Sequence, residues 1–170
     1  MPGFVRGARF FIHAFACPLF TGTWTATLVS NVAFMRKGAA AQTSTALIPL
    51  EVQFRIRPGS KLKVNRIRFF YTVGTAALTS AIAFRLRQGT LPAEGTAVSS
   101  ASIAATKDLA DATTLAIGDH TCIVTPSSDV YVGDGQWVHL EVDFPAAATT
   151  VLDFKGALVE YTEPPQYSAQ

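Results

Sequence analysis

Three histidines are the side chains best suited to acid–base chemistry, and the sequence identifies an orienting partner for none of them. His13 lies in an apolar stretch, and His139 alternates toward solvent on a predicted strand. Asp119 and His120 are adjacent, but neighbours on a strand point to opposite faces, so they cannot pair directly. Because a catalytic nucleophile or base needs an orienting partner, we expect no catalytic residue and no enzymatic activity.

The acidic side chains offer no better-defined site. Glu141 and Asp143 share one face of a predicted strand, and Asp129 and Asp134 flank a loop. Calcium needs six to eight oxygen ligands, and no EF-hand spacing occurs around these residues. The sequence also lacks a phosphate-binding loop and the nucleophile elbow of a hydrolase. We expect no metal site and no cofactor.

The elements that would position any site are β-strands. Apolar and polar residues alternate with a period of two, as expected for strands with one buried and one solvated face, and Gly- and Pro-containing turns separate these runs. The pattern predicts an all-β fold, an antiparallel β-sandwich of jelly-roll-like type. Alternation is clearest at residues 48–57, 82–87 and 138–144; further strands are predicted near 23–34, 98–106, 119–125 and 129–132, and a loop at 106–117.

Two predicted strands change phase. Between residues 62 and 73 the apolar positions move from even to odd numbers, which a β-bulge near Asn65 and Arg66 would reconcile. In residues 151–161, apolar side chains occur at both even-numbered and odd-numbered positions, so neither face of this predicted strand is polar. Either Gly156 forms a bulge or bend, or both faces of this strand are covered, one by the core and one by a partner.

Length and composition favour one domain that contacts other chains. The 170 residues suffice for a single core, while hydrophobic residues make up 49% and charged residues only 15%. Either another chain covers part of the surface, or the surface is rich in Ala and Thr. No apolar run reaches the length that spans a membrane. Cys17 and Cys122 have no metal-ligand spacing, and we favour two free buried thiols over a disulfide.

The N-terminal residues 1–20 form an apolar segment that mimics a signal peptide. His13 and Pro18 interrupt its apolar run, and no clear cleavage site follows. We interpret it as an arm or first strand that docks on a neighbouring chain, with a sandwich domain at 21–162 and a polar tail at 163–170. The arm residues expected to bind a partner are Phe4, Phe10, Phe11, Ile12, Phe15 and Phe20.

The two parts of the chain carry opposite charge. Residues 1–107 hold thirteen Lys or Arg against two acidic residues, and residues 108–170 hold one against ten. Outward arginines on neighbouring strands would form a basic face that docks on protein or, less favoured, on nucleic acid. A nucleic-acid site usually also has exposed aromatic side chains between the basic ones, and among the aromatic residues of these strands only Phe70 alternates outward. We favour a third alternative, pairing with the acidic strands within the sandwich. The arginines concerned are Arg55, Arg57, Arg66, Arg68, Arg85 and Arg87.

Two stretches carry a family resemblance. "SAIAFRLRQGTLPAEGTAV" and "GDHTCIVTPSSDVYVGDGQWVHLEVDFPAAATTVLDFKGALVEYT" combine a charged strand, a Pro/Gly loop and a closing "F-x-G-A-x-V-x-Y". Over residues 45–162 the chain resembles small β-sandwich virion proteins of tailed bacteriophages. The resemblance implies a virion structural role, with capsid decoration (cement) proteins as the nearest type. It also implies a homotrimer at the capsid surface whose partner is the major capsid protein.

Two functions therefore compete. The leading one is a non-enzymatic structural protein that binds capsid subunits and reinforces the shell. The alternative is a carbohydrate-binding or receptor-binding module of a phage tail, since jelly rolls often bind sugars. A sugar site would expose aromatic platforms, for which Trp24 and Trp137 are the tryptophan candidates, although both also suit a core or an interface.

Overall fold

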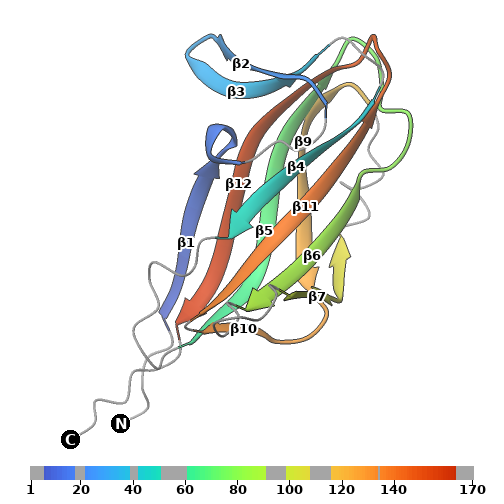
Figure 1. Ribbon diagram of the computed structural model, residues 1–170. Helices are drawn as coiled ribbons and strands as arrows, with labels where there is room; N and C mark the ends of the chain where they lie inside the picture. Colours follow the sequence, from blue (N-terminus) through green and yellow to red (C-terminus); the bar gives the residue numbers. More distant parts are fainter. Residues whose placement is uncertain are drawn as a thin grey trace, which may run out of the picture.

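Two sheets of antiparallel strands pack face to face in the computed structural model (Figure 1), which confirms the expected all-β sandwich. The structure describes residues 6–17, 22–38, 42–50, 61–90, 99–107, 116–133 and 135–163. Its elements are β1 (Arg6–His13), the 3-10 turn η1 (Ala14–Ala16), β2 (Trp24–Val29), β3 (Val32–Lys37), β4 (Gln42–Leu50), β5 (Lys61–Gly74), β6 (Ala83–Thr90), β7 (Ser99–Ile103), β8 (Ala105–Lys107), β9 (Gly118–Pro126), β10 (Val130–Gly133), β11 (Gln136–Ala146) and β12 (Val151–Glu163).

The larger sheet is built around β12 and β5. Its strand order is β2-β3-β12-β5-β9-β8, with β1 also paired to β12 and β10 also paired to β5. The smaller sheet has the order β4-β11-β6-β7. Every ladder is antiparallel, and strands from the two ends of the chain, β1 and β12, lie side by side (Figure 1).

The predicted phase change in β5 is a β-bulge. Glu160 and Tyr161 are consecutive in β12, yet they pair with Arg66 and Val64, so Asn65 is the extra residue of β5. The bulge keeps the apolar side chains on both sides of it in the core, although their numbers change from even to odd. The bulge expected near Asn65 and Arg66 is therefore confirmed.

The second phase change is a bulge at Gly156. Phe154 pairs with Tyr71 and Gly156 pairs with Phe70, so Lys155 is the extra residue of β12. Before the bulge the even-numbered residues face the core, and after it the odd-numbered residues do. Apolar residues therefore occur at both even and odd positions of this strand. The pattern thus needs no partner on a second face, and the expected homotrimer rests on the low charge of the sequence and on the family resemblance.

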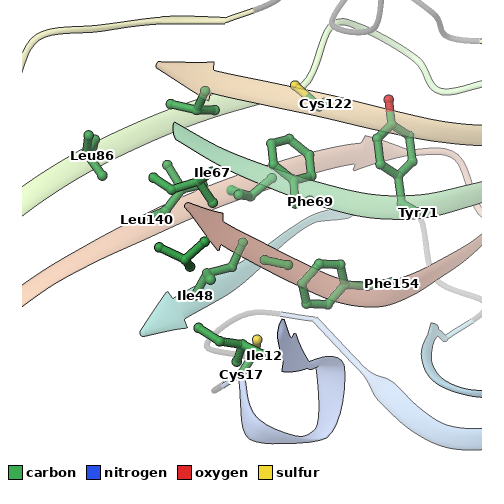
Figure 2. Close-up of a cluster of buried hydrophobic side chains, with 14 of the residues drawn as sticks. Ile12, Cys17, Ile48, Ile67, Phe69, Tyr71, Leu86, Cys122, Leu140 and Phe154 are labelled. Atoms are coloured by element: carbon green, nitrogen blue, oxygen red, sulfur yellow. The ribbon is translucent and has the colours of Figure 1, made fainter. Parts of the chain in front are cut away.

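Aromatic rings from both sheets meet at the centre of the core. The ring centroid of Phe144, on β11 of the smaller sheet, lies 5.6 Å from that of Tyr71, 6.1 Å from Phe69 and 5.9 Å from Phe154 on the larger sheet. All four side chains are fully buried. Figure 2 shows the large-sheet members of this group beside Leu140 of β11. The contacts hold the two sheets at a fixed separation.

Candidate functional site

The four described arginines of the expected basic face do not lie on one surface. Arg66 and Arg68 belong to β5 of the larger sheet, whereas Arg85 and Arg87 belong to β6 of the smaller one. Because these side chains point away from the core, the two pairs lie on opposite sides of the sandwich. Residues 51–60, which include Arg55 and Arg57, lie outside the described residues.

On the larger sheet, Glu160 forms ion pairs with both arginines. Arg66 Nε lies 2.5 Å from Glu160 Oε2, and Arg68 Nη2 lies 2.7 Å from Glu160 Oε1. Glu160 is buried. Burial alone would raise the pKa of this carboxyl group, but the hydrogen bond from Arg66 and the charges of Arg66, Arg68 and Arg9 outweigh it and lower the pKa. Glu160 therefore stays ionised and paired.

On the smaller sheet, acidic β11 lies beside basic β6. Arg85 Nε lies 2.6 Å from Glu141 Oε2, and Arg85 Nη2 lies 3.0 Å from Asp143 Oδ2. Arg87 Nε is 3.5 Å from Glu141 Oε1. The acidic later part of the sequence is thus paired with the basic earlier part by antiparallel strands, as the internal-pairing alternative predicts. The charge asymmetry of the sequence does not give these strands opposed patches.

Much of the expected N-terminal arm is a strand of the sandwich. β1 pairs with β12 from Arg6 to His13, because β12 has a free ladder edge there. Ile12 is buried and Phe10 packs edge-on against Tyr161, with centroids 5.8 Å apart. The described part of residues 1–20 is therefore not a separate arm, because most of it is a strand of the sandwich.

The expected partner-binding residues of the arm divide into three groups. Ile12 and Phe10 contact the core of their own chain. Phe11 and Phe15 are each 52% exposed and remain available to a ligand or partner. Phe4 and Phe20 lie outside the described residues.

Cys17 lies at the end of this segment, directly after η1, and its thiol is buried. It follows η1, whose Phe15 amide donates to His13 Nδ1 (3.2 Å). Burial raises the pKa of the Cys17 thiol to about 12. Cys17 and Cys122 are both free and buried, as favoured from the sequence.

A hairpin formed by β2 and β3 projects from the edge of the larger sheet (Figure 1). Ser30 and Asn31 both have positive φ, 49° and 65°, as in the tight two-residue turns that match strand twist. This turn divides the single strand predicted near residues 23–34. Beside it Leu28, Val29 and Val32 are 67%, 47% and 50% exposed. We call these three residues the hairpin tip.

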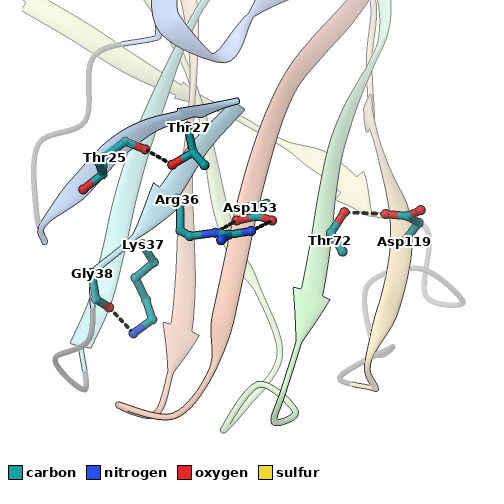
Figure 3. A network of polar contacts seen from close by, with 8 residues as sticks. All are labelled: Thr25, Thr27, Arg36, Lys37, Gly38, Thr72, Asp119 and Asp153. Carbon is teal, nitrogen blue, oxygen red and sulfur yellow. Dashed lines mark hydrogen bonds and ion pairs between the residues drawn. The ribbon is translucent and has the colours of Figure 1, made fainter. Parts of the chain in front are cut away.

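The base of the hairpin is held on β12. β3 pairs with β12 only through Arg36 and Met35, opposite Asp153 and Phe154. Arg36 donates two hydrogen bonds to the buried Asp153 carboxylate, Nε to Oδ1 at 2.7 Å and Nη2 to Oδ2 at 2.8 Å (Figure 3). This bidentate pair fixes the direction in which the tip points.

A groove of about 430 Å³ lies on the outer face of the larger sheet, where β1, β12, β5 and β9 are neighbours. Its apolar side chains are Phe11, Phe70 and Leu158. The rings of Phe11 and Phe70 have centroids 6.2 Å apart and planes inclined at 42°. Its polar residues are Asp119, His120, Thr121 and Lys155.

Asp119, Lys155 and His120 of the groove each have a defined hydrogen-bond partner. Asp119 accepts hydrogen bonds from Lys155 Nζ (2.7 Å) and from the Thr72 hydroxyl (Figure 3). These hydrogen bonds, that of Lys155 first, lower the pKa of Asp119. His120 has different partners, the Ala116 carbonyl (2.9 Å) and the ring of Tyr71. Asp119 and His120 are thus directed to different neighbours.

The two tryptophans are less open than a sugar platform requires. Trp24 is half-buried, with its ring edge-on to Phe144 at 6.2 Å. Trp137 is half-buried and lies over Gly89, where an added β-carbon would collide with the indole ring. Phe11 is more open than either tryptophan, because it is 52% exposed, and it lies beside the half-buried Phe70. Outward alternation marks Phe70 in the sequence, but nothing local identifies Phe11 as its neighbour.

Within the described ranges, no three His, Cys, Asp or Glu side chains are placed to hold a metal ion together. Nor do the described residues include a helix that could reach across a lipid bilayer.

Comparison with known proteins gives remote similarities only. No protein-family model matches the chain, and neither does any curated protein. Among solved structures, the xylan-binding module CBM86 from Roseburia intestinalis is 15% identical with a TM-score of 0.36, over 94% of this chain and 96% of that one. The CBM22-1 and GH10 modules of xylanase 10B from Clostridium thermocellum, complexed with xylohexaose, are 15% identical with a TM-score of 0.28. The match covers 96% of this chain but 27% of the xylanase. Similarity at this level carries no argument about a ligand.

Proposed function

We propose that this protein is a non-enzymatic structural component of a virion, a capsid decoration protein that attaches to capsid subunits and reinforces the shell. The observation that carries attachment is the projecting hairpin with its exposed apolar tip, Leu28, Val29 and Val32. The virion setting and the major capsid protein as partner come from the resemblance of residues 45–162 to virion proteins. On that resemblance and on the low charge of the sequence, we also propose a homotrimer at the capsid surface.

Apolar burial supplies the affinity. Each tip side chain contributes about 1.5–3 kcal/mol when it is fully buried against a neighbour. A specific contact needs about 800 Å² per partner, so the flanks of the hairpin take part as well. Because Arg36 and Asp153 fix its base, little conformational freedom is lost when the tip docks.

Charge plays a minor part in this attachment. The arginines of β5 and β6 already pair with Glu160, Glu141 and Asp143 in their own chain. A strong salt dependence of attachment would need further ion pairs that form across the new contact. We therefore expect attachment to change little with ionic strength.

Cosedimentation with empty capsids of the encoding virus tests the proposal. The double variant Leu28→Ser/Val29→Ser should bind at least about tenfold more weakly, because two apolar anchors are lost. The matched control is Ile117→Ser, which removes another exposed apolar side chain (61% exposed) far from the hairpin in sequence.

Capsid binding that survives in the double variant, or that is lost equally in Ile117→Ser, would exclude the hairpin tip as the anchor. Sedimentation equilibrium of the free protein separately tests the homotrimer, and a monomer at micromolar concentration would exclude it.

A further inference from the structure

The groove between Phe11 and Phe70 has a composition that its structural role does not explain. The fold would ordinarily place polar side chains on this outer face, as it does with Arg68 and Glu160 one step further along the strands. Instead two phenyl rings and Leu158 stand beside a charged pair, Asp119 and Lys155.

The space between the rings depends on Gly156. This residue lies in β12 between the strands that carry Phe11 and Phe70, and it has a φ of +132°. A β-carbon there would lie 2.8 Å from Phe11 Cζ and would collide with the Ile12 carbonyl oxygen. The bulge at Lys155 and Gly156 therefore removes a side chain from the groove and places Lys155 at its edge.

The charges at the groove favour a neutral ligand. Lys155 Nζ and Asp119 Oδ1 are 2.7 Å apart and balance each other, so neither an anion nor a cation finds an unpaired opposite charge there. Both groups keep hydrogen-bonding capacity, because Asp119 has further lone pairs and the ammonium of Lys155 has further N–H donors. The Thr121 hydroxyl adds a group that can both donate and accept.

We propose that this groove binds an uncharged carbohydrate chain, as a binding activity additional to capsid attachment. One face of a pyranose ring presents C–H groups, which pack against the negative face of a phenyl ring, while its hydroxyls point sideways. Phe11 and Phe70 contact the C–H faces, and Asp119, Thr121 and Lys155 exchange hydrogen bonds with the hydroxyls. The cavity of about 430 Å³ lies within the usual range for small-ligand sites.

An apolar protein segment is the competing occupant, and the groove suits it less well. Such a segment would cover Asp119 and Lys155 without offering them hydrogen bonds, and desolvating an ion pair without replacement bonds is unfavourable. A hydroxyl-rich ligand satisfies the same groups as it covers them.

Titration of the full chain with neutral hexasaccharides of glucose, xylose and mannose, followed by calorimetry and by amide NMR shifts, tests the proposal. At least one of the three should bind and shift amides of β1, β9 and β12. Phe11→Ala and Phe70→Ala should each weaken that binding about tenfold. Phe15→Ala is the matched control, because Phe15 is as exposed as Phe11 but does not line the groove.

Unfolding midpoints of all three variants show whether the fold is kept. If Phe70→Ala unfolds, Phe11→Ala and Lys155→Met serve instead; the second variant removes the ammonium group with its three N–H donors. The proposal is overturned if no neutral hexasaccharide binds at millimolar concentration, if Phe15→Ala weakens binding as much as Phe11→Ala, or if a polygalacturonate hexamer binds more tightly.

Capsid cosedimentation of Phe11→Ala separates the two proposals. Normal capsid binding with lost sugar binding supports both. Lost capsid binding by Phe11→Ala without any sugar binding would identify the groove as a protein contact and overturn the carbohydrate proposal. Failure of the hairpin variant to lose capsid binding leaves the sugar result unaffected.

Discussion

Gly156 lies against the ring of Phe11, so that a β-carbon at residue 156 would meet the ring Cζ atom at 2.8 Å. The same residue has a φ of +132°, which other residues rarely adopt. One glycine therefore both makes the bulge of β12 and leaves room for the aromatic groove. The backbone also approaches this position: the Ile12 carbonyl oxygen would lie closer to such a β-carbon than the ring does, and the Ala14 nitrogen would lie 3.1 Å from it.

Substitution Gly156→Ala should destabilise the protein by at least about 1–3 kcal/mol, because it adds backbone strain and a collision with backbone that cannot move aside. Chemical denaturation measures the change. The control is Gly7→Ala in the adjacent strand, where an added β-carbon meets nothing within 4 Å and stability should change by less than about 0.5 kcal/mol. Equal effects in the two variants would contradict the bulge geometry.

Phe144→Ala should cost about 3–5 kcal/mol, the usual range for a buried phenylalanine. Its ring contacts Phe69, Tyr71 and Phe154 of the opposite sheet, so the cavity opens where the two sheets meet. Thermal unfolding measures this cost. Exposed Phe15→Ala, the comparison variant, should leave the midpoint nearly unchanged; a small effect at residue 144 would show that the sheets are held together elsewhere.

Acid should destabilise the wild type more than Glu160→Gln. The pKa of Glu160 is lowered in the folded state, since the charges and hydrogen bond of its arginines outweigh burial. Such a group contributes stability above its unfolded pKa and loses it as pH falls through its folded pKa. The unfolding midpoint, measured from about pH 7 to about pH 3, should therefore fall less steeply in Glu160→Gln.

Asp129→Asn provides the comparison for this pH series. Asp129 also pairs with a cation, Lys63 Nζ at 2.6 Å, but its side chain is 59% exposed, and exposed pairs add little to stability. Identical pH profiles for Glu160→Gln and the wild type would show that the buried pair does not support the fold.

Reversal of Arg85 and Arg87 to Glu should reduce stability by about 1–2 kcal/mol through repulsion of Glu141 and Asp143. Added salt should restore part of the loss. Capsid attachment should remain unchanged at temperatures where the variant is folded. A variant of normal stability that no longer attaches would show that these arginines contact the partner directly.

The sequence predicts the sandwich and the bulge near Asn65, because the alternation of apolar and polar residues along a strand shows which side chains face the core. At Gly156 it leaves two explanations open, a bulge or a strand covered on both faces, and only the pairing of β12 with β5 decides for the bulge. The turn at Ser30 and Asn31 is missed, since this pair is a weaker hairpin signal than Asn-Gly and residues 32–35, which follow it, are apolar without alternation.

The groove and the division of the arginines depend on which strands are neighbours. Phe11 and Phe70 are far apart in the sequence, and only the pairing of β1 and β5 with β12 brings them together. Likewise Arg66 and Arg85 have the same local pattern of charges, yet their strands lie in different sheets. Such long-range pairing leaves no mark on the local alternation of residues.

A density map of the intact virion would show directly where this chain lies. We expect it on the outer surface of the capsid, with Leu28, Val29 and Val32 buried against a neighbouring subunit and the Phe11–Phe70 groove open to solvent. A map that places the chain at the tail tip, that lacks it, or that leaves the hairpin tip in solvent would contradict the account.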